Sequence, residues 1–308
     1  MITMGKVLLA RKTYPKVMQV ISIGSSFVIV SLILGYLVYR QREVLFGFKW
    51  QFRIQYLFLS FFLFSCSLVL VSFIWGQIIN ALAGTQHFIY HMRFFCISNF
   101  IKRLPGTIWY LLSRTSLYKE IGISAQATLI ASGIEFIVAL ISSALVGLFL
   151  LIRVFPGYMG MLYILLLLVI GGGLIHPKVL SMILKLFRVS TPGSVGYRQL
   201  VIWVIGYGIV WVINGLILYS IANIVTYVPA IHISKTIQSV TLANVVTSLL
   251  LFAPTNLGAT EVSISAILST FLPSSVAVVI TIFSRVLLTI FDLIWGGIAL
   301  LILPSKVN

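Results

Sequence analysis

Apolar residues fill long stretches of this chain from one end to the other. The stretches that are long enough to form a transmembrane helix occupy residues 17–39, 54–82, 122–152, 158–175, 199–226 and 276–303. A helix needs about 20 such residues to cross about 30 Å of hydrocarbon. The pattern therefore predicts an all-α fold, a polytopic integral membrane bundle of about seven or eight segments that forms one transmembrane domain over residues 1–308.

Two further apolar segments, residues 94–113 and 237–272, are interrupted by proline and glycine. Pro105 and Gly106 break the first segment, and Pro254 breaks the second. Proline lacks an amide donor and glycine relaxes the limits on the backbone, so both segments are expected to be broken or re-entrant helices. Paired interruptions in the two halves of a chain are typical of a transporter's central site. Chance similarity between two apolar stretches accounts for the pattern equally well.

The distribution of charge fits a membrane surface and does not fit nucleic-acid binding. The chain is 60% hydrophobic and 8% charged, with a mean hydropathy of +1.13 and a formal net charge of +16. Its basic residues lie in short connections between apolar runs, where they favour the cytoplasmic side and anionic headgroups. Residues 1–16, 83–121 and 176–198 carry most of them, which predicts a multi-pass protein of the cell membrane with a cytoplasmic N-terminus. The basic and aromatic stretch 40–53 is expected on the headgroups, but it would also fit the reversed orientation.

Three of the five acidic residues lie inside apolar stretches, namely Glu135, Glu261 and Asp292. A carboxylate in hydrocarbon costs several kcal/mol unless it faces a partner or a polar cavity, so such residues usually mark a pathway. Arg285 and Asp292 are seven residues apart, which puts them on one face of the last helix, about 10 Å apart along its axis. Glu261 is the expected partner of Arg285. The alternative is a buried salt bridge that only fixes the packing of the helices.

Polar residues also gather around the first interruption. Asn99 and Arg103 lie beside it, and Trp109 and Arg114 follow. Arginine's planar guanidinium suits a phosphate, and tryptophan is common at the level of the headgroups. These residues are candidates for binding an inner-leaflet headgroup, although ordinary cytoplasmic flanking charges would give a similar pattern. Glu135 is expected to pair with Arg114 or Arg103.

Small residues recur along one face of one predicted helix. Gly208, Gly215 and Ala222 are spaced every seven residues within the run 199–226. Small residues let membrane helices approach closely, so this face is expected to pack against a neighbouring helix.

No motif indicates a catalytic, metal or cofactor site. The chain lacks HExxH and similar metal-ligand spacings, a P-loop and GxSxG. Its histidines fall at predicted helix ends or in loops, where structural roles are usual: His87, His91, His176 and His232. We therefore expect no enzyme activity, no metal and no cofactor.

Two motifs and the residues that follow them resemble a known family. The first is Asn99-Phe-Ile-Lys-Arg-Leu-Pro105-Gly106-Thr-Ile-Trp109, with Arg114, Gly122 and Glu135 downstream. The second is Pro254-Thr-Asn-Leu-Gly258-Ala-Thr-Glu261, with Arg285, Asp292 and Gly296 downstream. With them, residues 55–300 resemble the transmembrane region of lysylphosphatidylglycerol synthases, also found as stand-alone flippase-like membrane proteins. Trp109 departs from the acid that many members carry and resembles a variant found beside glycosyltransferases, while Thr255 and Asn256 replace common paired glycines.

The resemblance implies translocation of a lipid or lipid-linked headgroup through a polar cavity within the membrane. Its implied partners are a membrane phospholipid or polyprenyl-linked lipid. The family's soluble aminoacyl-transfer domain is not found in these residues, so synthesis of a lysyl-lipid is not implied. The substrate-binding candidates are Asn99, Arg103, Pro105, Gly106, Trp109, Arg114, Glu135, Pro254, Asn256, Gly258, Glu261, Arg285 and Asp292.

Two other functions remain open from the residues alone. One is a membrane transferase that acts on a polyprenyl-linked sugar with Glu261 or Asp292 as base, although the connecting loops are nearly free of acids. The other is an accessory subunit that docks a glycosyltransferase. The sequence gives neither the lipid nor the oligomeric state.

Overall fold

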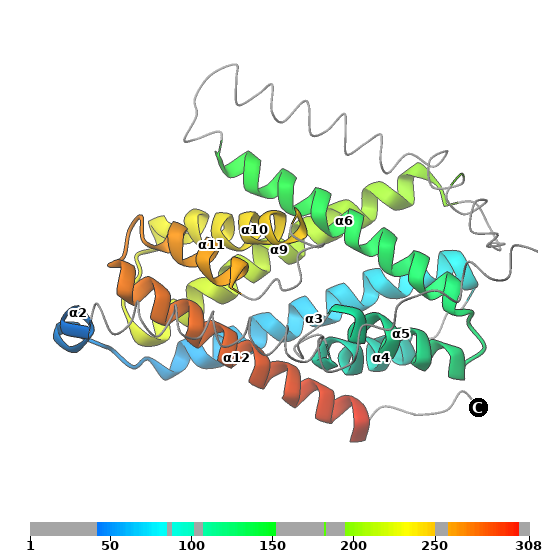
Figure 1. Ribbon diagram of the computed structural model, residues 1–308, viewed down its shortest axis with the longest axis horizontal. Helices are drawn as coiled ribbons and strands as arrows, with labels where there is room; N and C mark the ends of the chain where they lie inside the picture. The colour runs from blue at the N-terminus through cyan, green and yellow to red at the C-terminus, as the bar shows by residue number, and fades with distance from the viewer. Residues whose placement is uncertain are drawn as a thin grey trace, which may run out of the picture.

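Helices make up the regular structure of every described part of the chain. The computed structural model describes residues 42–84, 88–101, 107–151, 182, 195–249 and 258–301. Within these residues, four helices are long and apolar enough to cross a membrane (Figure 1): α3 (Ile54–Ala83), α6 (Ala125–Leu151), α9 (Tyr197–Val225) and α12 (Ser274–Leu301). At 1.5 Å per residue they measure about 40–45 Å, more than the hydrocarbon thickness. The predicted all-α membrane bundle is confirmed, while the runs 17–39 and 158–175 lie outside the described residues.

Helices α3 and α9 form the centre of the bundle and run antiparallel. Ser67 of α3 donates a hydrogen bond to Asn214 of α9 (3.1 Å), and further along α3 the Gln77 carbonyl accepts one from the Trp203 indole N–H (3.1 Å). The residue numbers rise along one helix and fall along the other, which fixes the direction. Gly215 lies so close to α10 (Ile233–Leu249) that a Cβ there would be 2.5 Å from the Cα of Ile237. The small-residue face of α9 therefore packs against a helix, as predicted.

Two pairs of shorter helices flank the interruptions predicted from proline and glycine. Helices α4 (Phe88–Ile101) and α5 (Thr107–Glu120) contact each other and form the first hairpin, and α10 and α11 (Ala259–Leu268) form the second. The described parts of these four helices measure about 15–26 Å, less than the roughly 30 Å of a bilayer's hydrocarbon. The predicted breaks at Pro105 and Pro254 fall between the described parts of these helices. The interrupting residues themselves, 102–106 and 250–257, lie outside the described part of the chain.

The two hairpins enter the bundle from opposite ends. The first hairpin follows α3 directly, after Gly84 closes α3 at φ +72° with an N–H bond to Asn80 (2.8 Å). It therefore starts from the carboxyl end of α3. The second hairpin follows α9, whose last turn lies at the amino end of α3, because the Arg53 N–H donates to the Ile224 carbonyl there (2.9 Å). In Figure 1 the second hairpin lies in the left half of the bundle and the first in the right half.

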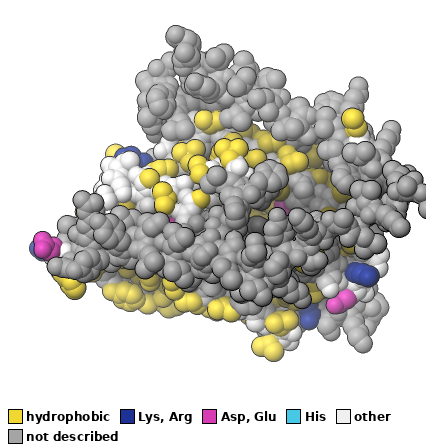
Figure 2. Space-filling model, in the orientation of Figure 1, with side chains coloured by type: hydrophobic (Ala, Val, Ile, Leu, Met, Phe, Trp, Pro, Cys, Tyr) yellow, Lys and Arg dark blue, Asp and Glu magenta, His cyan; other side chains and the backbone are white. Residues whose placement is uncertain are grey.

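The outer surface agrees with insertion in a membrane along this axis. Large apolar side chains are exposed on all four long helices, among them Phe62 on α3 and Ile205 on α9. Figure 2 shows apolar side chains over much of the described surface, while charged side chains are visible mainly near its left and right ends. At the left end, α2 (Arg42–Gly47) and the stretch after it expose Phe46 and Phe52, as expected for a segment on the headgroups.

Candidate functional site

Helix α12 holds a residue from each hairpin. The Asp292 carboxylate accepts a hydrogen bond from the Asn99 amide of α4 (2.7 Å), and Arg285 forms an ion pair with Glu261 of α11. Arg285 and Asp292 lie about 4 Å and about 7 Å on either side of the midpoint of the helix, by its rise of 1.5 Å per residue. The pairing of Glu261 with Arg285 is confirmed. Asn99, which precedes the first interruption, and Glu261, which follows the second, thus both bind α12 near its midpoint.

Glu261 is held at the start of α11 by the local backbone. Gly258 takes φ +96°, a conformation that favours glycine, and its N–H donates to Glu261 Oε2 (3.0 Å). The carboxylate thus caps the helix to which it belongs and lies at the positive end of the helix dipole. The Glu261 side chain is 6% exposed, whereas that of Arg285 is 43% exposed. The acid of this pair is buried and the cation is open to the outside of the bundle.

A second ion pair joins the first hairpin to α6. Arg114 of α5 pairs with Glu135, which lies about 5 Å from the midpoint of α6. Glu135 also accepts hydrogen bonds from the hydroxyls of Tyr207 (2.7 Å) and Tyr110 (3.1 Å), and Arg114 Nε donates to Ser98 Oγ (3.3 Å). The sequence left Arg114 and Arg103 open as partners of Glu135, and the structure shows the pair with Arg114.

Aromatic rings enclose the Arg114 guanidinium. Its Cζ lies 3.8 Å from the ring centre of Trp75, 4.5 Å from that of Tyr110 and 4.8 Å from that of Phe95. Arg114 is 1% exposed, so nearly all of its surface contacts other residues of the bundle. Such contacts stabilise a desolvated cation by about 2 kcal/mol. In this conformation Arg114 fastens α5 to α3 and α6, and a headgroup could reach it only if these groups separated.

The sequence interpretation missed the polar aromatic residues around this pair. Tyr118 accepts a hydrogen bond from the Trp75 indole N–H (2.7 Å), and its hydroxyl lies 2.9 Å from His91 Nδ1. His91, for which a structural role near a helix end was expected, lies near the start of α4, and its ring is buried against Gly76. The only signal in the sequence was the presence of Tyr, Trp and His within apolar stretches. The same residue types are common at a membrane surface, so the sequence did not distinguish the two positions.

The remaining candidates cannot be placed at the site. Arg103, Pro105, Gly106, Pro254 and Asn256 lie outside the described residues. Trp109 lies in α5, and its side chain is not described. Among the described residues, no group of three or more His, Cys, Asp or Glu side chains could hold a metal ion.

Fold and site together define the class of the protein as an all-helical membrane bundle with ion pairs near the middle of its long helices. No family model matches the chain, and the comparison with curated proteins finds no significant match. The likeness to the transmembrane region of lysylphosphatidylglycerol synthases therefore stays a prediction.

Proposed function

We propose that this protein is a multi-pass protein of the cell membrane that translocates a lipid or lipid-linked headgroup. The observation that carries the proposal is the Glu261–Arg285 pair. Its cation lies close to the midpoint of α12 and is 43% exposed, while its acid is buried. An ion pair that only fixed packing would bury both charges, as the Arg114–Glu135 pair does.

The energetics of a bilayer favour this interpretation. An arginine at the bilayer centre costs at least about 2.5–3.5 kcal/mol and is usually found where it serves a substrate or ion pathway. The guanidinium of Arg285 can bind a phosphate with two parallel hydrogen bonds, which a lysine could not do. A phosphate beside Arg285 would compete with Glu261, and Glu261 would keep its hydrogen bond from the Gly258 amide. Binding of the headgroup would therefore replace the Glu261 carboxylate with a phosphate as the anion paired with Arg285.

The path of the headgroup would then follow α12. Asp292 lies about 10 Å further along the same helix and is bound to the first hairpin through Asn99. The second hairpin approaches from the amino end of α3 and the first from its carboxyl end. A headgroup that moves between Arg285 and Asp292 would pass from contact with one hairpin to contact with the other. Hairpins and broken helices of this kind form the central sites of secondary transporters.

The test is reconstitution in liposomes with lipids labelled on the headgroup, followed by a quencher that cannot cross the membrane. We expect Glu261→Gln and Arg285→Gln to abolish translocation singly, because each leaves the other charge without its partner. The swapped variant, Glu261→Arg with Arg285→Glu, should recover part of the rate. Lys119→Ala is the control, since Lys119 is exposed at the end of α5. Normal translocation by both single variants would overturn the proposal.

A further inference from the structure

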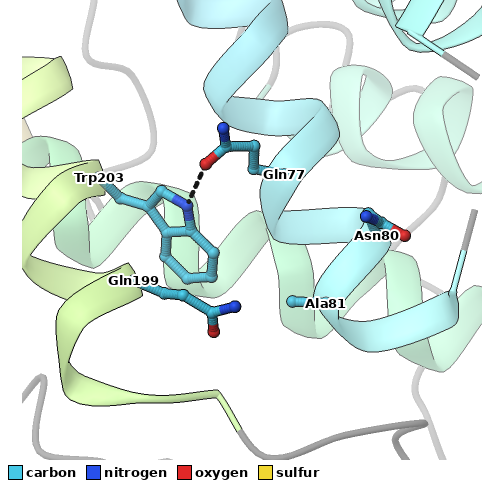
Figure 3. Close-up of a pocket in the computed structure, with 5 residues that line it drawn as sticks. All are labelled: Gln77, Asn80, Ala81, Gln199 and Trp203. Atoms are coloured by element: carbon cyan, nitrogen blue, oxygen red, sulfur yellow. Dashed lines mark hydrogen bonds between the residues drawn. The ribbon is translucent and has the colours of Figure 1, made fainter. Parts of the chain in front are cut away.

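A separate polar pocket lies at the carboxyl end of α3, away from the charged residues described above. Its volume is about 240 Å³, and it is lined by Gln77, Asn80, Ala81, Gln199 and Trp203. Figure 3 shows Gln77 and Ala81 in the last turns of α3 pointing toward Trp203 and Gln199 in the first turns of α9, with Asn80 beside them on α3. The pocket therefore lies at the end of two membrane-length helices, which is the level of the headgroups if they span the bilayer.

Carboxamide groups supply the hydrogen-bonding capacity of this pocket. The Trp203 indole can only donate, so its bond to Gln77 (3.1 Å) engages the Gln77 oxygen and leaves the amide NH₂ available. The Gln199 oxygen likewise accepts from the Gly196 N–H (3.1 Å). Among the described residues, no hydrogen-bond partner is found for the Asn80 carboxamide, which offers both donors and an acceptor.

The chemistry of the lining selects a class of ligand. Among the described residues, none that lines the pocket carries a charged side chain. A charged group would therefore lose its hydration without gaining a counter-charge, which is costly. Hydroxyl groups both donate and accept, so they match a set of carboxamides with unused donors and one unused acceptor. The pocket is also smaller than the roughly 300–1,000 Å³ that holds drug-sized molecules.

We propose that this pocket binds an uncharged, hydroxyl-rich group, either a single sugar ring or a polyol of similar size. Its position at the ends of α3 and α9 makes a membrane lipid the source of that group. The pocket lies where the first hairpin leaves α3, so a lipid bound there would wait beside the hairpin that contacts Asp292. That the bound lipid is also transported rests on the proposed function, whereas binding of the lipid to this pocket does not.

The binding test compares two lipids that differ only in the headgroup. Purified protein in detergent is mixed with equal amounts of monoglucosyl diacylglycerol and diacylglycerol, and the bound lipids are counted by native mass spectrometry. We expect the glucosyl lipid to be strongly preferred by the unmodified protein. Asn80→Leu should reduce the ratio about tenfold, the effect of losing one or two hydrogen bonds. Gln126→Leu is the matched control, because Gln126 is exposed at the start of α6 and does not line the pocket.

A ratio near one for the unmodified protein, or an equal ratio for Asn80→Leu and the control, would overturn the proposal. Gln199→Met provides the same test if Asn80→Leu does not fold. Free glucose is added as a competitor. Displacement of the lipid by millimolar glucose would support recognition of the sugar ring itself. Displacement at a glucose concentration equal to that of the lipid would identify a soluble sugar as the source, because a lipid ligand should bind more tightly than its free headgroup.

The same variants are then assayed for translocation in liposomes, which separates this inference from the proposed function. If no lipid is translocated but the glucosyl preference depends on Asn80, the pocket stands and the proposed function fails. If lipid is translocated while Asn80→Leu changes neither binding nor rate, the pocket is wrong and the proposed function stands.

Discussion

The Arg114–Glu135 pair allows a quantitative test of what holds the bundle together. Glu135→Gln keeps the size of the side chain but leaves a guanidinium that is 1% exposed without its counter-charge. Removing one member of a buried pair costs about 3–5 kcal/mol. Arginine cannot release its proton in a protein, so the variant has no way to relieve the cost. Against a typical total stability of about 5–15 kcal/mol, this loss should be large.

The reverse substitution, Arg114→Gln, should behave differently with pH. It leaves Glu135 buried beside Tyr207 and Tyr110, and a carboxylate can be neutralised by taking up a proton. The folded variant then binds a proton that the unfolded chain releases near neutral pH. Lower pH therefore stabilises the folded form, by up to about 1.4 kcal/mol per unit. Glu135→Gln has no such group, so its deficit relative to the unmodified protein should not shrink in this way.

The assay is unfolding of the purified variants in detergent at pH 5.5, 6.5 and 7.5, followed by loss of helical circular dichroism. At pH 7.5 both variants should be several kcal/mol less stable than the unmodified protein. At pH 5.5 Arg114→Gln should recover most of its loss and Glu135→Gln should not. The reasoning would be refuted if Glu135→Gln were within about 1 kcal/mol of the unmodified protein, or if the two variants showed the same pH dependence.

Two further predictions concern packing and pH at other positions. Gly215→Ala places a methyl group 2.5 Å from the Ile237 backbone and should cost about 1–3 kcal/mol. Gly208→Ala, whose new methyl would make an ordinary contact at 3.8 Å, should be neutral or stabilising in the same thermal unfolding measurement. His232, beyond the end of α9, has a pKa lowered by burial and by Lys235, so the folded state disfavours its protonation. Stability should thus fall as pH drops through the ordinary histidine value of about 6.5, and His232→Gln should remove that part of the dependence.

The long helices could be predicted from sequence because the chemistry of single residues determines them. An apolar run of membrane length can satisfy its backbone only as a helix, so the runs 54–82 and 276–303 predicted α3 and α12 closely. Pro105 and Pro254, which predict the breaks, lie outside the described residues. The Glu261–Arg285 pair was predictable because the chain has only five acidic residues, which leaves few possible partners.

Contacts that depend on packing could not be predicted in this way. The sequence predicts a broken or re-entrant segment at 94–113, but it does not show that Arg114 is buried within the first hairpin. Nothing in the sequence separates a topological arginine from one enclosed by Trp75 and Phe95, because these rings come from two other helices, α3 and α4. Asn99 was selected for its place before the break, and its bond to Asp292 joins residues 193 positions apart.

The position of α12 explains how two hairpins could serve one site. Each hairpin holds this helix by a contact near its midpoint, through Asn99 in one case and Glu261 in the other. On the proposed function, losing one of these contacts would loosen one hairpin on α12 while the other hairpin stays bound. On the proposed function, a phosphate at Arg285 would break only the Glu261 contact. The first hairpin would then remain bound to Asp292 and keep the opposite end closed, which is the condition for moving a headgroup without opening a continuous path through the membrane.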